Sequence, residues 1–288
     1  MNRVQYPAIE CDDVYSACLL SVSRNNLPYK VKLQSIADVV ADQWTTFDDR
    51  CSPKNFHLFV PCLPKRKEQN ISRGVTKEEL MDLYSVHMLK ANSASRKVYD
   101  KLRASSYGLC PLCGINEATT LDHYLPKARY PLLSVNPRNL IPACQDCNKG
   151  KSAGIFNSAS DQTLYPYNED IKFYQTDWIS ATISSNYGIL VFDFFADPPQ
   201  RWLEIEKNRV KNHFDNFGLR KKYSRNASQF VPTITHDIKR MLLNGNHRMV
   251  QDYYASLAEA QKKNTTFRII YKALAEDEDI CGGSFLEF

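Results

Sequence analysis

The sequence predicts a mainly helical chain that carries one small module of mixed structure, so the protein is α+β overall. Two observations carry this prediction. Most segments show apolar residues that recur every three or four positions, and two Cys-x-x-Cys pairs, 110–113 and 144–147, are separated by thirty residues. We therefore expect a helical N-terminal region over 1–104, a module over 105–156, and a C-terminal region over 157–288 with one hairpin followed by helices.

The composition is that of a globular protein, with 43% hydrophobic and 24% charged residues among 288. The net charge of +5 permits a polyanionic partner without requiring one. No segment reaches the roughly 18 consecutive apolar residues of a membrane span. The apolar stretch 14–22 follows Glu10, Asp12 and Asp13, whereas a secretory signal would place basic residues there. We expect a cytoplasmic protein with no membrane partner.

Helix signals run through the N-terminal region. Amphipathic patterns predict one helix after Asp12 and a second through Trp44, and Thr76 with Glu79 has the spacing of a capping box. Ser95 is the expected N-cap of a further helix. The stretch 51–74 has little periodicity and predicts a loop, whose basic run 65–67 is more typical of a solvated segment than of a phosphate contact.

The C-terminal region begins with an alternating pattern over 181–195, which predicts a hairpin with its turn at 186–188. A helix is expected over 201–217, with Gly218 as its stop. Three apolar stripes in the last seventy residues predict packed helices. His213 lies between apolar positions of the first helix, so we expect a packing or docking residue rather than a catalytic one.

The nine cysteines form an odd count in a large chain without an export signal, which argues against a disulfide framework. Two residues between paired cysteines let one tight turn direct both sulfurs to a single ion. We therefore expect a structural zinc ion, with no open position for water, bound by Cys110, Cys113, Cys144 and Cys147. The remaining five are expected to be small core residues: Cys11, Cys18, Cys51, Cys62 and Cys281.

Polar residues within and after this cysteine frame have the chemistry needed to hydrolyse a phosphodiester. Histidine, with an ordinary pKa of ~6.5, can take a proton from water near neutral pH, which makes His123 the candidate base. Asp122 and Asn148 offer hard oxygen ligands for Mg²⁺ or Mn²⁺. Asn139 is placed to hold the imidazole or its backbone. Because successive strand residues face opposite ways, the strand should end or twist at the 122–123 pair.

The order of these residues resembles the zinc-stapled HNH endonucleases, also called His-Me finger or ββα-metal nucleases. The likeness lies in acid-histidine at 122–123, Asn-Leu at 139–140 and Cys-Asn-Lys at 147–149. It implies a two-stranded hairpin followed by a helix around one divalent ion. By this resemblance His123 is the general base, Asp122 and Asn148 are the metal ligands, and Asn139 is the orienting asparagine.

A second resemblance extends to flanking residues. Tyr84, the approach 98–100 into the first cysteine pair, and Asn212-His213-Phe214 with Gly218-Leu219 are similar to the PtuB-type HNH proteins of bacterial Septu and retron anti-phage systems. This implies a defence effector whose partner is an ABC-like ATPase of the PtuA type, either alone or within a retron complex, and flanking helices that form docking surface.

Two other functions stay open at this point: a zinc-knuckle module that binds nucleic acid without cutting it, and an inactive structural subunit. Enzyme chemistry is favoured because a binder does not need the base and the oxygen ligands in that order. DNA is the default substrate, and RNA such as tRNA is an alternative. The expected phosphate contacts are Lys127, Arg129, Arg138, Lys149 and Lys151.

Overall fold

The computed structural model describes residues 3–9, 11–52, 54–150 and 154–286. The chain divides into two compact units. The N-terminal unit comprises Asn2–Pro111 and Asn116–Asn168, and the C-terminal unit comprises Glu169–Phe288 together with the short turn Leu112–Ile115. The expected three-part division at 104 and 156 stays a prediction.

The N-terminal unit begins with a series of helices, as the periodicity predicts. They are α1 (Cys11–Ser21), α2 (Leu27–Gln34), α3 (Ala37–Cys51), α4 (Lys77–Asp82), which continues as a π-helical segment Leu83–Met88, and α5 (Ala94–Ala104). A short antiparallel pair, β1 (Asn70–Ser72) and β2 (Val75–Thr76), interrupts the stretch expected to be a loop.

The helix starts test two of the predicted caps. At α4 the Thr76 hydroxyl accepts from the Glu79 amide, and the Glu79 carboxylate accepts from the Thr76 amide, which confirms the capping box. The prediction for α5 was wrong by two residues. Ser93 is its N-cap and accepts from the Arg96 amide, whereas Ser95 is fully buried inside the first turn and its hydroxyl donates to the His87 carbonyl.

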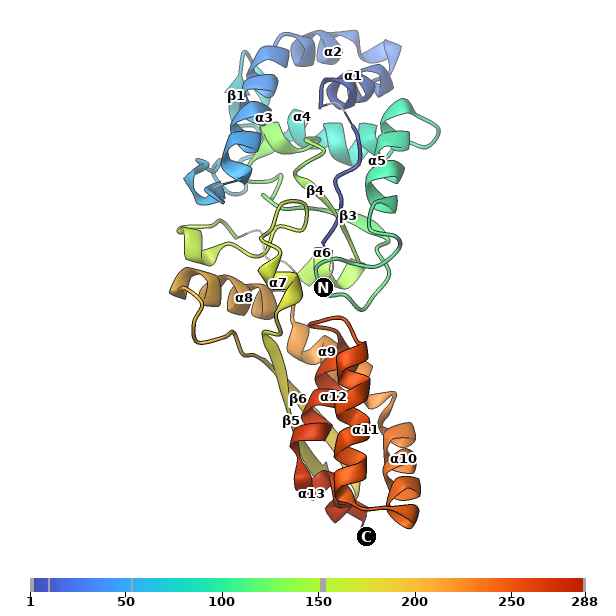
Figure 1. Ribbon diagram of the computed structural model, residues 1–288. Coiled ribbons are helices and arrows are strands. Elements are labelled where there is room, and N and C mark those ends of the chain that lie inside the picture. The colour runs from blue at the N-terminus through green and yellow to red at the C-terminus, as the bar shows by residue number, and fades with distance from the viewer. Residues whose placement is uncertain (1–2, 10, 53, 151–153, 287–288) are drawn as a thin grey trace. The chain divides into compact units, whose positions relative to one another are not determined.

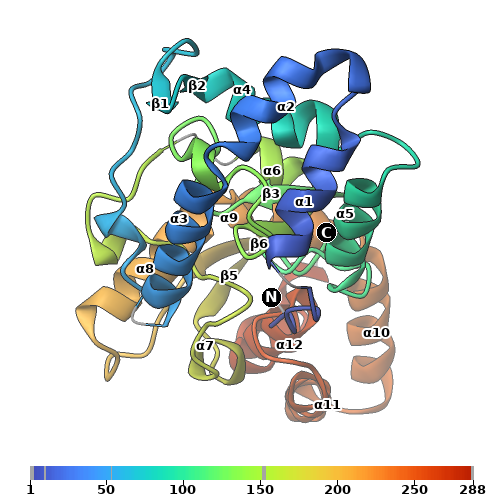
Figure 2. The ribbon, with the colours of Figure 1, turned by 90° about the horizontal axis from the view of Figure 1, so that it is seen from above.

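The small mixed module consists of β3 (Thr120–His123), β4 (Leu140–Ala143) and α6 (Gln145–Gly150). The two strands pair antiparallel, with His123 opposite Leu140 and Thr120 opposite Ala143. Both views show α3 and α5 on opposite sides of this hairpin (Figures 1 and 2). A cluster of buried aromatic rings that includes Phe56, Tyr124 and Tyr165 extends the core of the unit next to it.

The C-terminal unit is built on a long hairpin and a set of helices (Figure 1). Its strands are β5 (Ile179–Asn186) and β6 (Ile189–Ala196). Its helices are α7 (Lys172–Gln175), α8 (Glu204–Asn216), α9 (Leu219–Ser228), α10 (Val231–Asn244), α11 (His247–Ala260), α12 (Thr266–Glu276) and α13 (Glu278–Cys281). The three predicted stripes fall on α10, α11 and α12, where Ile238, Val250 and Ile270 are fully buried.

Two predicted turns of this unit are confirmed. Tyr187 and Gly188 connect β5 to β6, both with positive φ, which is the geometry of a type I′ turn. Gly218 has φ 58° and separates α8 from α9. A side chain there would meet the steric cost of the left-handed region, which explains the glycine.

The cysteines outside the frame are mostly core residues. Cys18, Cys51 and Cys281 are buried, as predicted. Cys62 is only half-buried, because it lies in the irregular segment before β1 rather than in a packed helix. The prediction for the side chain of Cys11 lies outside the described residues.

None of the described helices combines the length and the apolar character that crossing a membrane requires.

Candidate active site

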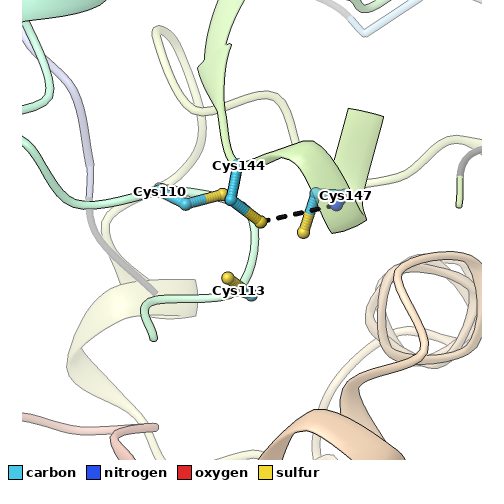
Figure 3. Close-up of side chains that lie close together, drawn as sticks. All are labelled: Cys110, Cys113, Cys144 and Cys147. Carbon is cyan, nitrogen blue, oxygen red and sulfur yellow. Dashed lines mark hydrogen bonds between the residues drawn. The ribbon is translucent and has the colours of Figure 1, made fainter. Parts of the chain in front are cut away.

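Four cysteines, one pair before β3 and one pair at the end of β4, form a single cluster. Cys110, Cys113, Cys144 and Cys147 are all buried, and their sulfur atoms all lie within 4.8 Å of one another. Figure 3 shows the four thiols turned toward a common centre. A closed set of four buried sulfurs fits the tetrahedral coordination of a structural zinc ion and leaves no ligand position for water. The two pairs that the sequence predicts as one cluster are thus brought together.

Hydrogen bonds to the backbone or to a sulfur atom fix the geometry of both cysteine pairs. The Cys110 amide donates to the Asn116 carbonyl at 2.9 Å, which closes the first turn. In the second pair the Cys147 amide donates to Cys144 Sγ at 3.4 Å (Figure 3). Asn116 Nδ2 lies 3.8 Å from the same sulfur. Donors directed at sulfur stabilise its thiolate form, which is the form that binds metal.

Two residues of the C-terminal unit hold the turn Leu112–Ile115, which belongs to that unit. His213 Nε2 lies 2.8 Å from the Leu112 carbonyl, and the Tyr223 hydroxyl donates to the Cys113 carbonyl at 3.2 Å. Both side chains have no exposed surface. His213 is therefore a packing residue, as predicted. The role of Tyr223 was missed, since a hydroxyl that reaches a carbonyl 110 positions away has no sequence signal.

The acid-histidine pair lies at the end of β3. The strand ends at His123, as the geometric argument requires, and Asp122 and His123 are 7% and 8% exposed. His123 Nε2 lies 2.8 Å from the Ser134 carbonyl, so Nε2 carries the proton and donates. The neutral ring then has its lone pair on Nδ1. This is the tautomer in which Nδ1 can accept a proton from water.

Tyr84 supports the histidine ring. The two ring centroids are 4.4 Å apart in an edge-to-face arrangement, and the Tyr84 hydroxyl donates to the Leu121 carbonyl on the same strand. Burial raises the pKa of Tyr84, so the phenol keeps the proton that it donates. The sequence places Tyr84 on an apolar stripe but gives no sign of this contact.

Asn139 holds the loop that connects the strands. Its Oδ1 accepts from the Leu125 amide at 2.7 Å, and its Nδ2 donates to the carbonyls of Leu125 and Leu133 at 3.0 and 3.1 Å. Leu125 follows His123 by two positions, and Leu133 precedes the carbonyl that binds the histidine. Asn139 thus fixes backbone on both sides of the imidazole. The sequence leaves two possible partners for Asn139, the imidazole of His123 and the backbone near it. The hydrogen bonds of Asn139 go to this backbone.

Replacing Asn139 with alanine should destabilise the protein by about 2–4 kcal/mol, because it leaves buried backbone groups of the loop without partners. Urea unfolding measures the loss, and amide exchange at Leu125 reports whether the loop opens locally. Asn157→Ala is the matched control, since this side chain is exposed in the same unit. An Asn139→Ala protein as stable as this control would contradict the assigned role.

Asp122 and Asn148 are the two residues that the sequence predicts as ligands of a second metal ion. Asn148, on α6, donates from Nδ2 to Thr120 Oγ1 at 3.2 Å and to the Leu121 carbonyl at 3.4 Å. These bonds attach α6 to β3 and leave the amide oxygen as the atom that can bind a cation. A buried carboxylate and an amide oxygen are the ligand types that Mg²⁺ and Mn²⁺ prefer. The residues thus fit a hard divalent ion.

The five predicted phosphate contacts have different surroundings. Lys127 is half-buried, its Nζ lies 4.8 Å from the centre of the Tyr84 ring, and burial lowers the pKa of Lys127. Arg138 is 3.1 Å from Asp48 and covers the Tyr6 ring, so its charge is partly neutralised. Arg129 is half-buried and Lys149 is exposed on α6. The prediction for Lys151 lies outside the described residues.

Comparison with known proteins gives one family and two relatives. Residues 110–154 match the family model for the HNH endonuclease. Protein ea31 of Escherichia phage lambda is 29% identical over 226 residues, which are 73% of this chain and 76% of that protein. The Septu protein PtuB of Bacillus thuringiensis is 38% identical over 60 residues, 21% of this chain and 23% of PtuB. No solved structure matches the chain.

The family match spans both cysteine pairs, the strand with Asp122 and His123, and α6 with Asn148. The fold over this range is a hairpin followed by a helix, as the sequence resemblance implies. Residues 110–154 of this chain are an HNH endonuclease domain with a buried four-cysteine cluster.

Proposed function

We propose that this protein is a metal-dependent endonuclease that hydrolyses phosphodiester bonds of nucleic acid. The observation that supports this most directly is His123. It is buried at the end of β3 next to Asp122, and its Nε2 is bound to the Ser134 carbonyl. A surface polar residue of a simple binding module would have no need for a fixed tautomer.

Each residue of the site has its own role in the proposed reaction. His123 Nδ1 takes the proton as a water oxygen forms its bond to phosphorus, and the bond from phosphorus to one ester oxygen breaks. Asp122 and Asn148 would hold Mg²⁺ or Mn²⁺, and this ion would supply positive charge to stabilise the phosphate and the departing oxygen. Asn139 keeps the loop around the imidazole in place. The four cysteines bind zinc and take no part in the chemistry.

The purified protein should cut nucleic acid only when Mg²⁺ or Mn²⁺ is present, and Asp122→Asn should lower the cutting rate at least about 100-fold, because a neutral amide binds a hard cation more weakly. The assay uses plasmid DNA, single-stranded DNA and tRNA in parallel, which also identifies the substrate. Asp49→Asn, a change at an exposed acid of the same unit, is the control and should cut normally.

Two results would contradict this function. Cutting that is unaffected by EDTA would exclude the hard-ion site. Tight binding of a nucleic acid by a protein that does not cut it in either metal would support the alternative, a zinc-knuckle binding module.

We further propose that the nuclease acts in bacterial anti-phage defence with an ABC-like ATPase of the PtuA type. The support is the likeness to PtuB, which covers 23% of that protein. An ATPase encoded next to this chain should copurify with it, and cutting by the complex should then depend on ATP. A chain that cuts at full rate alone, with no effect of the ATPase, would instead be a free nuclease.

A further inference from the structure

One aromatic ring contacts both the proposed general base and a lysine. Tyr84 lies in the π-helical segment Leu83–Met88 and is 8% exposed. Its ring centre is 4.4 Å from that of His123, and Lys127 Nζ lies over the ring at 4.8 Å from the same centre. Lys127 Nζ and the centre of the imidazole are therefore at most about 9 Å apart. All three residues belong to the N-terminal unit.

The ammonium group of Lys127 is held in place by neutral groups. It donates to the Ser85 hydroxyl and faces the π system of Tyr84. No acidic side chain of the described residues forms an ion pair with Lys127, and Asp82 acts on its charge only from a distance. Burial removes part of the hydration of the ammonium and lowers the pKa of Lys127. An ammonium has three N–H donors, so this group can still bind an anion.

Two other predicted phosphate contacts have different surroundings. Arg138 is partly neutralised by Asp48, and Lys149 is exposed on α6. Lys127, in contrast, shares a neighbour with His123 and has a fixed position next to it. The structure therefore singles out Lys127 as a cation that can act on the same phosphate as the base.

The separation from His123 indicates which phosphate oxygen the lysine can reach. In hydrolysis the water oxygen lies ~3 Å from the base nitrogen and ~3–3.5 Å from phosphorus, and the departing oxygen lies on the far side. A cation bonded to the departing oxygen would lie roughly 10–12 Å from the imidazole centre, whereas one bonded to a non-bridging oxygen would lie roughly 6–9 Å away. The limit of about 9 Å fits the non-bridging position.

We propose that Lys127 is a catalytic residue that binds a non-bridging oxygen of the scissile phosphate, and that Tyr84 is the positioning residue that holds Lys127 and His123 around one phosphate. As the water oxygen bonds to phosphorus, its proton passes to His123. The ester oxygen leaves with the electron pair of the broken bond and takes a proton from solvent. Lys127 offsets the negative charge that the attacking water approaches. This inference rests on the proposed endonuclease activity.

Lys127→Met tests the lysine, because methionine keeps much of the apolar stem beside Tyr84 and removes the charge. The variant should cut about 100-fold more slowly, the scale of one lost transition-state donor, and should unfold at nearly the wild-type temperature. Lys97→Met, at an exposed lysine on α5 in the same unit, is the control and should cut normally. Equal cutting rates of the two variants would overturn the proposal.

Sulfur at one non-bridging position separates contact with the substrate from support of the fold. The probe is an oligonucleotide of the class that the wild type cuts, with one phosphorothioate of Rp or Sp configuration at the cut position. In one configuration the wild type should cut at least about tenfold more slowly than with oxygen, in Mg²⁺ and Mn²⁺ alike, because a charge-assisted hydrogen bond is weakened. In Lys127→Met this difference should disappear. An unchanged difference would show that the lysine only supports the fold.

Tyr84→Leu removes the ring that holds both groups, and Tyr84→Phe keeps it. Tyr84→Phe should cut nearly as fast as the wild type, whereas Tyr84→Leu should cut at least about tenfold more slowly because both groups are misplaced. The leucine change should cost Lys127→Met less than it costs the wild type, since the contribution through the lysine is already lost. Additive losses would overturn the positioning role.

The outcomes separate this inference from the proposed function. A wild type that cuts no nucleic acid would overturn the endonuclease activity and the roles of Lys127 and Tyr84 together. A wild type that cuts, with no response to the change at Lys127, would overturn these roles alone. If Tyr84→Leu does not fold, the sulfur comparison with Lys127→Met still decides.

Discussion

Replacement of His123 by alanine should lower the cutting rate by about 10²–10⁴-fold, the usual contribution of a positioned general base. The variant loses the nitrogen that accepts the proton from water, but it keeps the four cysteines and both proposed ligands of the catalytic ion. It should therefore bind the same nucleic acid, retain zinc and unfold at nearly the same temperature. Cleavage kinetics under single-turnover conditions measure the loss without interference from product release.

The matched control is His247→Ala, because His247 is an exposed histidine in the C-terminal unit. It should cut at the normal rate. A His123→Ala protein that cuts as fast as this control would disprove the assignment of the base. A variant that loses both zinc and structure would show instead that the buried ring, packed against Tyr84, is needed mainly for folding.

The second large effect is expected at the cysteine cluster. Cys144→Ser should lose zinc and unfold the hairpin and α6, because a structural zinc ion in a small module contributes about 10–16 kcal/mol of binding free energy that is available only in the folded state. Metal analysis should find about one zinc ion per wild-type chain and much less in the variant. A strong chelator added to the wild type should have the same effect on structure.

Cys62→Ser provides the control, since this thiol is half-buried and lies outside the cluster. It should keep both zinc and structure. If wild-type protein prepared without chelators contains no tightly bound metal, the cluster is a group of reduced thiols, and the explanation given for the stability of the module is wrong.

The sequence predicts the parts of the fold that depend on local chemistry. Thr76 and Glu79 satisfy each other's backbone within one helical turn, and Tyr187 with Gly188 provides the positive φ angles that a tight hairpin needs. The cysteine cluster could also be predicted from the sequence, because a spacing of two residues constrains the positions of both sulfurs in a pair. In each of these cases the interacting groups are close in sequence.

Contacts between distant segments could not be predicted. Ser134 binds His123 through its backbone carbonyl, a group that every residue has, so no residue type marks the position. Ser93 and Ser95 are both good caps by composition, and packing against the hydroxyl of Ser21 determines which one is buried. The contact between Lys127 and Tyr84 depends on how the segment after β3 approaches the π-helical segment. Only tertiary structure determines these relations.

The hydrogen bonds from His213 and Tyr223 to the turn Leu112–Ile115 limit how this chain can be divided or recombined. A fragment that ends at Asn168 would contain all four zinc ligands but would leave the carbonyls of Leu112 and Cys113 without these donors. The segment 110–154 that matches the family model therefore depends on residues outside it. In chimeras between HNH proteins, the C-terminal region and this turn should therefore be taken from the same parent protein.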